Sequence, residues 1–308
     1  MQDRFAVRQK QFAGEGKLSA FNLAMVAEGL DVIAELNEQN VGGQVVEQRL
    51  GEFKSWDPEI LKVDRDVESQ YIKRLAELDV PIVLLSEEAG REEVNPSAEG
   101  ARYYCVCDPF DGSYLIQHGI PDFWYSSMAF YNADFRPACC AVGDGVHRKI
   151  AFANENGAFI ADLVDDHFEH RFQLNDEFRK GIGRPGKQSP EGASIESYAM
   201  KPTKFLFPLV DRWRDVLAPF KFLLPNGGPY GFVDVAEGKI DCYFAPGQPF
   251  MDVFSGVQIA EKAGVIVTDF DDKPIRCSDD VETVHDVLAS VNRSLHEQVL
   301  ELIQGCRG

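Results

Sequence analysis

Two aspartates follow an apolar run at residues 105–111, which read Cys-Val-Cys-Asp-Pro-Phe-Asp. Pro109 fixes one backbone angle and stiffens the turn, so Asp108 and Asp111 can point at one spot with the Phe110 carbonyl beside them. Hard oxygens from two carboxylates and a carbonyl favour Mg²⁺, with Mn²⁺ as an alternative, over zinc. This stretch therefore predicts ligands for a divalent cation.

The next two residues are suited to an anion. Gly112 lets the backbone approach a ligand closely. If a helix or turn begins here, the amides of Gly112 and Ser113 face outward as an anion site. Cation ligands beside anion donors indicate a metal-bridged phosphate.

Four more acidic residues lie where predicted elements begin or end. Glu87 and Glu88 follow an apolar run, whereas Asp64 and Asp252 each lie where a helix begins. Taken singly, these residues are typical of a solvated strand end or a helix cap. Burying a carboxylate in the middle of a core is unfavourable. A carboxylate at the end of a helix or strand can instead face a shared cleft. The functional interpretation depends on the joint pattern.

Two other classes of acidic motif do not fit. The haloacid-dehalogenase phosphatases need a nucleophile two residues before the second acid, where this chain has Pro109. An EF-hand loop counted from Asp108 would place Phe110 third and Gly119 twelfth, where calcium ligands are required.

Composition restricts the partners. The net charge of −19 repels phosphate backbones and argues against nucleic acid. No apolar run reaches the roughly 18 residues of a membrane span, and the N-terminus lacks the profile of a signal peptide. The seven cysteines have no zinc spacing and are expected to be buried, reduced thiols. We therefore expect a cytoplasmic protein without membrane partners.

Hydrophobic periodicity predicts the elements that hold these residues. Helices are expected at 18–40, 59–78, 204–220, 252–264 and 283–304. Strands are expected at 81–86, 102–107, 125–132, 137–142, 149–154, after the Asn156-Gly157 turn, at 239–245 and at 265–270. The segment 232–238 fits a helix or a strand, and 162–200 is expected to be mostly loop, with the boundary between two halves near it.

Four motifs together resemble the inositol monophosphatase family, within the lithium-sensitive, magnesium-dependent sugar-phosphatase superfamily. They are Asp-Pro-Phe-Asp-Gly-Ser at 108–113, Phe-Met-Asp before a helix ending in Ala-Gly at 250–264, Glu-Glu after a strand in 84–90, and Asp-Arg-Asp-Val-Glu at 64–68. Their order and spacing agree over residues 18–275. The resemblance implies an α+β layered fold, a five-layer α-β-α-β-α sandwich with the active site between two halves. Residues 1–165 would carry most metal ligands, and residues 166–308 would carry Asp252 and the substrate side.

The resemblance also implies roles for single residues. The metal ligands would be Glu87, Asp108, the Phe110 carbonyl, Asp111 and Asp252, holding two or three Mg²⁺ ions. Glu87 and Ser113, the latter backed by Asp64, would orient the attacking water. Gly112 and Ser113 would bind the phosphate.

The substrate side departs from the family pattern. Ala245 stands where the family places a glutamate that holds sugar hydroxyls, and Gly227 and Gly228 lie in a stretch, Asn-Gly-Gly-Pro-Tyr-Gly, that replaces the family's substrate-lining residues. The leading hypothesis is a phosphomonoesterase acting on a small phosphorylated polyol, nominally inositol monophosphate. Fructose 1,6-bisphosphate, histidinol phosphate and 3′-phosphoadenosine 5′-phosphate stay open as substrates.

Three further expectations complete the sequence interpretation. A metal- or ligand-binding relative without turnover is the alternative class, which the full set of ligands argues against. His118 is a candidate general acid, although a polar loop histidine is the commoner case. The family resemblance implies a homodimer whose partner is a small phosphorylated metabolite.

Overall fold

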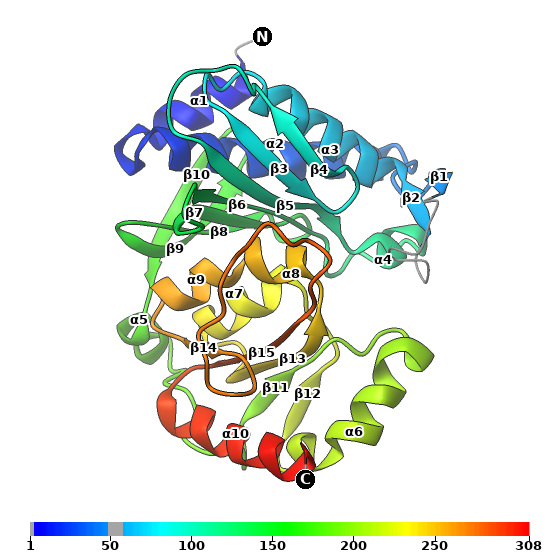
Figure 1. The fold of residues 1–308 in the computed structure, drawn as a ribbon, viewed down its shortest axis with the longest axis vertical. Helices are drawn as coiled ribbons and strands as arrows, with labels where there is room; N and C mark the ends of the chain where they lie inside the picture. Colours follow the sequence, from blue (N-terminus) through cyan, green and yellow to red (C-terminus); the bar gives the residue numbers. More distant parts are fainter. Residues whose placement is uncertain (1–2, 49–57, 308) are drawn as a thin grey trace. The chain divides into compact units, whose positions relative to one another are not determined.

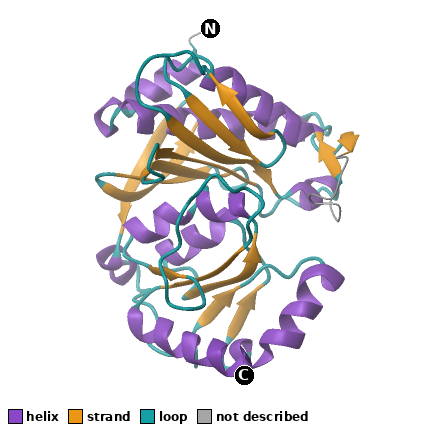
Figure 2. Ribbon diagram, in the orientation of Figure 1, coloured by secondary structure: helices purple, strands orange, loops and turns teal. Residues whose placement is uncertain are grey.

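The computed structural model describes residues 3–48 and 58–307. Contacts divide the chain into two compact units, one of Met1–Phe152 and Ala161–Arg171, the other of Ala153–Ile160 and Phe172–Gly308. Both units combine helices with a sheet (Figure 2), which confirms the predicted mixed α and β fold class. The division of the chain into two halves at residue 165 stays a prediction.

The first half of the chain forms an eight-stranded sheet with helices packed on it (Figure 1). Its strands follow the order β10-β9-β8-β7-β6-β5-β3-β4. Their bounds are β3 (Ile82–Ser86), β4 (Gly90–Val94), β5 (Tyr103–Asp111), β6 (Tyr125–Asn132), β7 (Pro137–Asp144), β8 (Lys149–Asn154), β9 (Gly157–Val164) and β10 (His167–Leu174). The helices are α1 (Arg4–Gln11), α2 (Lys17–Glu38), α3 (Lys62–Leu75) and α4 (Ser113–Gln117), with a short 3₁₀ turn at Ala13–Glu15 and a hairpin of β1 (Val45–Gln48) and β2 (Glu59–Leu61).

Helix α2 forms the centre of this core. It packs on β6 and β7 on one side and contacts α1 and α3. Leu30 and Ile33 are fully buried, and burying each such side chain contributes about 2 kcal/mol. The apolar positions at helical spacing predicted this element to within two residues.

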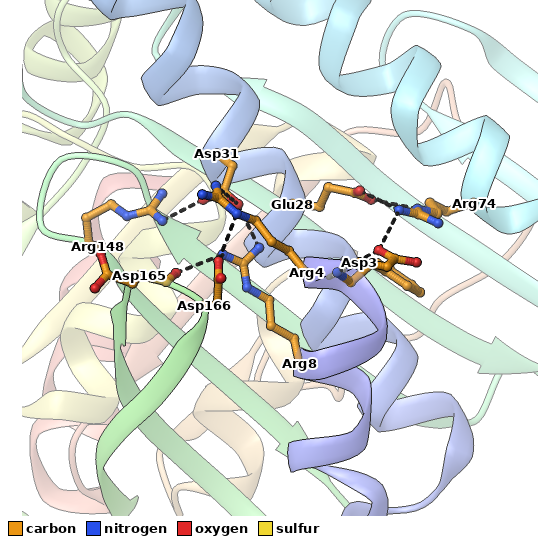
Figure 3. Close-up of polar contacts among 10 residues, drawn as sticks. Asp3, Arg4, Arg8, Glu28, Asp31, Arg74, Arg148, Asp165 and Asp166 are labelled. Atoms are coloured by element: carbon orange, nitrogen blue, oxygen red, sulfur yellow. Dashed lines mark hydrogen bonds and ion pairs between the residues drawn. The ribbon is translucent and has the colours of Figure 1, made fainter. Parts of the chain in front are cut away.

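A network of charged side chains fastens α1 to this core (Figure 3). Arg8 is completely buried, and its Nη1 donates to Asp31 Oδ2 at 2.8 Å while Nη2 donates to the Asp165 carbonyl at 2.9 Å. Arg148 donates from the other side to Asp31 Oδ1 at 2.6 Å. A buried guanidinium needs these partners, because an isolated buried charge is strongly unfavourable. The first helix is thus held by the turn between β9 and β10.

The second half of the chain contains a five-stranded sheet in the order β12-β11-β13-β15-β14. Helices α7, α8 and α9 lie on one face, and α6 and α10 lie on the other (Figure 1). The bounds are α5 (Asp176–Gly181), β11 (Ser194–Glu196), α6 (Phe207–Leu217), β12 (Phe222–Leu224), α7 (Pro229–Glu237), β13 (Cys242–Gln248), α8 (Phe250–Phe254), α9 (Val257–Lys262), β14 (Ile266–Thr268), β15 (His285–Ser290) and α10 (Arg293–Arg307). A π-helical turn at Pro202–Leu206 precedes α6.

The helix predicted at 252–264 is two helices, α8 and α9, separated at Ser255 and Gly256. A Cβ on Gly256 would lie 2.6 Å from the Pro229 carbonyl oxygen, closer than real contacts allow. The break therefore lets this segment approach the start of α7. Gly264 ends the second helix with a φ of 80°, as predicted.

Three element predictions were wrong. The helix predicted at 283–304 is β15 followed by α10, because residues 285–290 pair with β13 and β14. The predicted loop 162–200 contains β10, α5 and β11. The helix predicted from 59 begins at Lys62, after the short strand β2.

The two histidines nearest the C-terminus pack against the core. His296 is completely buried, with its Nε2 2.9 Å from Thr268 Oγ1 and its Nδ1 3.2 Å from Ser290 Oγ. Burial lowers its pKa to about 4, so the ring is neutral in the core. His285 is half-buried against Phe254. His285 on β15 and His296 on α10 both lie on the side of their element that faces the core.

Within the described parts of the chain, none of the helices has the combination of length and apolar character needed to cross a lipid bilayer.

Candidate active site

Parallel pairing of β3 and β5 brings two carboxylates together. Ser86 is opposite Cys107 in the register, so the next residues, Glu87 and Asp108, lie at the same end of the β3–β5 pairing. One carboxylate oxygen of each lies within 4.8 Å of the other, and Asp108 is only 2% exposed. Two neighbouring carboxylates at such a distance repel each other unless a cation or a proton lies between them. This pair has the donor chemistry of a magnesium site.

Strand β5 changes geometry where the signature begins. The β5–β6 register shifts between Asp108 and Asp111, and Phe110 is buried with 4% exposure. Pro109 lies within this irregular segment, where a missing N–H does not interrupt a regular ladder. The strand therefore carries both predicted aspartates at its end, as the sequence indicated.

Ser113 and Asp64 are hydrogen-bonded although they are far apart in the sequence. The Ser113 hydroxyl donates to Asp64 Oδ1 at 3.0 Å, and the Leu61 backbone N–H donates to Asp64 Oδ2 at 2.7 Å. Asp64 is 2% exposed and is the third residue of α3, not the N-cap that the sequence suggested. Its two oxygens are thus fixed, and Ser113 is held at the start of α4.

Glu68 was given no role from the sequence, yet it shapes the site. It is buried one helical turn after Asp64, and it accepts hydrogen bonds from the Ser86 hydroxyl and, at 2.8 Å, from the Ala89 backbone N–H. Burial is the main cause of a pKa raised above its usual value. Glu68 therefore holds both sides of the turn that presents Glu87. The spacing of four residues in Asp-Arg-Asp-Val-Glu was the available signal.

Gly112 turns the chain from β5 into α4. Its φ is 125°, and a Cβ at this position would lie 2.4 Å from the Phe123 carbonyl oxygen. We expect Gly112→Ala to lower the free energy of unfolding by about 2 kcal/mol and to reduce activity, because both the backbone angle and the space exclude a side chain. Thermal unfolding and kinetic assays of the same samples would measure both effects.

The matched control is Gly119→Ala. Gly119 has a φ of 64°, but a Cβ added there would meet nothing within 4 Å, so this variant isolates the backbone cost. Equal losses of stability in the two variants would contradict the steric part of the prediction.

Asp252 belongs to the second unit and is positioned there by its own neighbours. It is the third residue of α8, and Gln248 Nε2 at the end of β13 donates to its Oδ2 at 2.7 Å. The position at the start of a helix agrees with the sequence prediction.

The predicted substrate residues lie in the same unit. Gly227 and Gly228 are buried in the turn before α7, and Gly228 has a φ of 70°. Ala245 is 1% exposed inside β13 and brings only a methyl group, with no polar atom of its side chain. Their roles stay predictions.

The candidate general acid His118 lies on the surface. Its ring packs against Tyr114 with the ring centroids 4.3 Å apart, and its Nδ1 donates to the Tyr114 carbonyl at 2.8 Å. Both interactions are local to α4 and its end.

The predicted burial is found for most of the cysteines. All seven are free, and five of them are buried. Burial raises the pKa of the Cys139 and Cys242 thiols to about 12, which keeps them protonated and unreactive.

Comparison with known proteins places this fold in a class. No family model matches the chain. It is 26% identical to the Nus factor SuhB of Pseudomonas aeruginosa over 221 residues, which are 68% of this chain and 72% of that protein. It is also 26% identical to the fructose-1,6-bisphosphatase of Pyrococcus furiosus over 245 residues, 79% of this chain and 82% of that protein.

Solved structures agree in fold. A Pyrococcus horikoshii protein with similarities to inositol-1 monophosphatase superposes with a TM-score of 0.64 at 21% identity, covering 89% of this chain and 96% of its own. An IMPase/NADP phosphatase solved with Mg²⁺ and phosphate gives a TM-score of 0.62 at 19% identity, covering 89% of this chain and 91% of its own. The chain therefore has the mixed α/β fold of these solved structures. The resemblance to the inositol monophosphatase family that was drawn from its motifs is confirmed.

Proposed function

We propose that this protein is a magnesium-dependent phosphomonoesterase that hydrolyses a small phosphorylated polyol, nominally inositol monophosphate. The observation that carries the proposal is the pair of Glu87 and Asp108, whose carboxylate oxygens lie within 4.8 Å of each other at the ends of parallel strands. The strongly negative chain needs a local source of positive charge to accept a phosphate. A bound cation provides it.

The donor set fits Mg²⁺. We propose that Glu87, Asp108, Asp111 and the Phe110 carbonyl hold two or three ions together with Asp252 from the second unit, with Mn²⁺ as an alternative. When bound, such ions lower the pKa of a coordinated water, neutralise phosphate oxygens and stabilise the leaving alkoxide. The phosphate would lie against the amides of Gly112 and Ser113.

The protein's own side chains orient the attacking water. Because the Ser113 hydroxyl donates its proton to Asp64, its oxygen can only accept from a further partner. A water beside Ser113 would therefore donate one proton to it and direct a lone pair elsewhere. Glu87 would accept the other proton, and Glu68 holds the turn that presents Glu87.

A second substrate has support of its own. The Pyrococcus furiosus relative is a fructose-1,6-bisphosphatase, and the match covers 79% of this chain. Fructose 1,6-bisphosphate is therefore the second candidate, and histidinol phosphate and 3′-phosphoadenosine 5′-phosphate complete the set to be tested.

The test is phosphate release from inositol 1-phosphate and these three compounds. Each is assayed with Mg²⁺, after chelation, and with Mg²⁺ plus Li⁺. We expect release from at least one polyol phosphate that needs Mg²⁺ and is inhibited by Li⁺. Absence of release from every compound would overturn the enzyme proposal and favour a binding protein.

The Ser113–Asp64 hydrogen bond supports a second kinetic prediction. Ser113→Ala and Asp64→Asn are each expected to lower kcat by about 10–100-fold, because each removes the orientation of the same water. The double variant should lose little more than either single variant, since the two residues act as one unit. Losses that multiply in the double variant would show that the residues act independently.

Two properties of the whole protein follow from the family resemblance. We propose a cytoplasmic homodimer. Light scattering of the purified protein would decide the oligomeric state, and cell fractionation would decide the location.

A further inference from the structure

A buried cluster of polar side chains lies beside the turn that precedes α7. Glu196 at the end of β11 is completely buried, and its Oε1 accepts a hydrogen bond from Asn226 Nδ2 at 3.1 Å. Asn226 is itself only 3% exposed and is followed directly by Gly227 and Gly228. The Asn226 side chain thus ties this turn to the sheet.

The other oxygen of Glu196 requires a proton. Oε2 is buried and meets no N–H or hydroxyl donor in the described part of the chain. The carboxyl group of Asp234, on α7 and 5% exposed, interacts with Glu196 at the range of a carboxyl–carboxyl hydrogen bond. Two carboxyl groups can form such a bond only if one of them is protonated. A proton shared by Glu196 and Asp234 would supply the missing donor, as in paired carboxyls whose like charges cannot both ionise.

The charges around the pair are few. Lys239 lies 3.2 Å from Asp234 Oδ1 and 2.5 Å from Glu237 Oε2, so one ammonium faces three carboxyl groups in this cluster. Tyr243 of β13, opposite Glu196 in the register, adds a phenol but no charge. With the shared proton the cluster carries one net negative charge, and without it two. Loss of the proton therefore adds repulsion between the carboxyl groups of β11 and α7.

The directions of the pKa shifts agree with this geometry. Burial, with a smaller contribution from Asp234, raises the pKa of Glu196 well above its usual range. Burial also raises the pKa of Asp234 to about 6, against the opposing effect of Lys239. Stabilisation by the shared proton is complete below the unfolded-state pKa of about 4.3 and is lost as pH rises through the folded-state values.

We propose that Glu196 is a positioning residue: by sharing a proton with Asp234 and holding Asn226, it keeps the Asn226–Gly228 turn in the conformation that recognises the hydroxyl groups of the substrate. This role rests on the proposed function, because it requires that turn to line the polyol site. The close fit of the turn supports it, since a Cβ on Gly227 would lie 3.0 Å from Tyr198 Cβ. A small displacement of Asn226 would therefore shift the whole turn.

The decisive variant is Glu196→Gln. Gln has the shape of protonated Glu, accepts from Asn226 and donates to Asp234, but it does not titrate. The assay compares kcat/KM for the polyol phosphate identified above with kcat/KM for p-nitrophenyl phosphate, which has no hydroxyl groups to recognise. The ratio of the two cancels the ionisation of phosphate and of the metal site.

In the wild type we expect this ratio to fall about tenfold between pH 6 and pH 9, which is the effect of one pKa unit of coupling. In Glu196→Gln it should stay constant, and in Asn226→Ala it should be low at every pH. Glu191→Gln, an exposed neighbour with the same change of charge, should behave as the wild type. An unchanged pH profile in Glu196→Gln, or equal shifts for both substrates, would overturn the proposal.

A second measurement separates this inference from the proposed function. The thermal midpoint of Glu196→Gln should exceed that of the wild type at pH 9 and approach it at pH 5, with no substrate required. A wild type that hydrolyses neither substrate overturns the proposed function and the recognition role with it. Identical pH dependence of the two midpoints overturns the shared proton, whatever the activity.

Discussion

Asp108→Asn is expected to lower kcat/KM for the polyol phosphate by about 10³-fold or more while the fold is kept. Asn has the shape of Asp but lacks the negative charge, and loss of a proposed metal-ligating carboxylate would remove several kcal/mol of stabilisation from the transition state. The residue is 2% exposed and lies within 4.8 Å of Glu87 through their carboxylate oxygens. Steady-state kinetics at saturating Mg²⁺ would measure the loss.

Stability measurements distinguish a lost ligand from a damaged fold. Without metal, Asp108→Asn should be at least as stable as the wild type, because it removes repulsion between two carboxylates. Addition of Mg²⁺ should raise the thermal midpoint of the wild type but not that of the variant.

The control is Asp134→Asn, which makes the same change in the turn between β6 and β7. That turn lies at the opposite end of the paired strands from Asp108. The control should keep both activity and the response to Mg²⁺. A variant at Asp108 that is still stabilised by Mg²⁺ would contradict the assignment of this residue as a ligand.

Arg8→Ala is expected to lower the free energy of unfolding of the first unit by about 3–5 kcal/mol. Arg8 is completely buried, and its removal leaves Asp31 and the Asp165 carbonyl without the guanidinium that they now share. Breaking one side of a buried ion pair is costly because Asp31 Oδ2 stays largely desolvated, while Arg148 binds only the other oxygen, Oδ1. Urea unfolding followed by circular dichroism would measure the change.

Arg4 provides a matched control on the same helix. Its side chain is 61% exposed, although it also pairs with Asp166 at 2.9 Å (Figure 3). Exposed ion pairs contribute about 0–1 kcal/mol, so Arg4→Ala should be close to the wild type. Equal destabilisation by the two variants would show that burial of the ion pair does not determine the effect.

Much of the first unit could be predicted from the sequence. Helix α2 and strands β6 and β8 agree with the apolar patterns because each buries its own regular face against one core. The second unit was less predictable. Residues 285–290 form β15 because β13 and β14 offer edges for pairing, and an apolar run of that length is compatible with a helix as well.

Some residues of the candidate site could likewise be predicted from the sequence, and others could not. The sequence indicated Glu87, Asp108 and Asp111 because these acids directly follow the apolar runs that predict strands. It did not indicate Glu68 as the residue that holds the turn after β3, since that contact depends on how α3 packs. Nor did it indicate that Glu196 meets Asp234.

By itself, therefore, the sequence determined which acids stand at the ends of strands and helices, and hence the class of site this protein carries. Only the tertiary structure decided which of these groups meet. Ser113 reaches Asp64, and Asn226 reaches Glu196, across segments that no local pattern connects. The physical reason is that strand ends and caps follow from neighbouring residues, whereas distances between remote side chains follow from sheet register and packing.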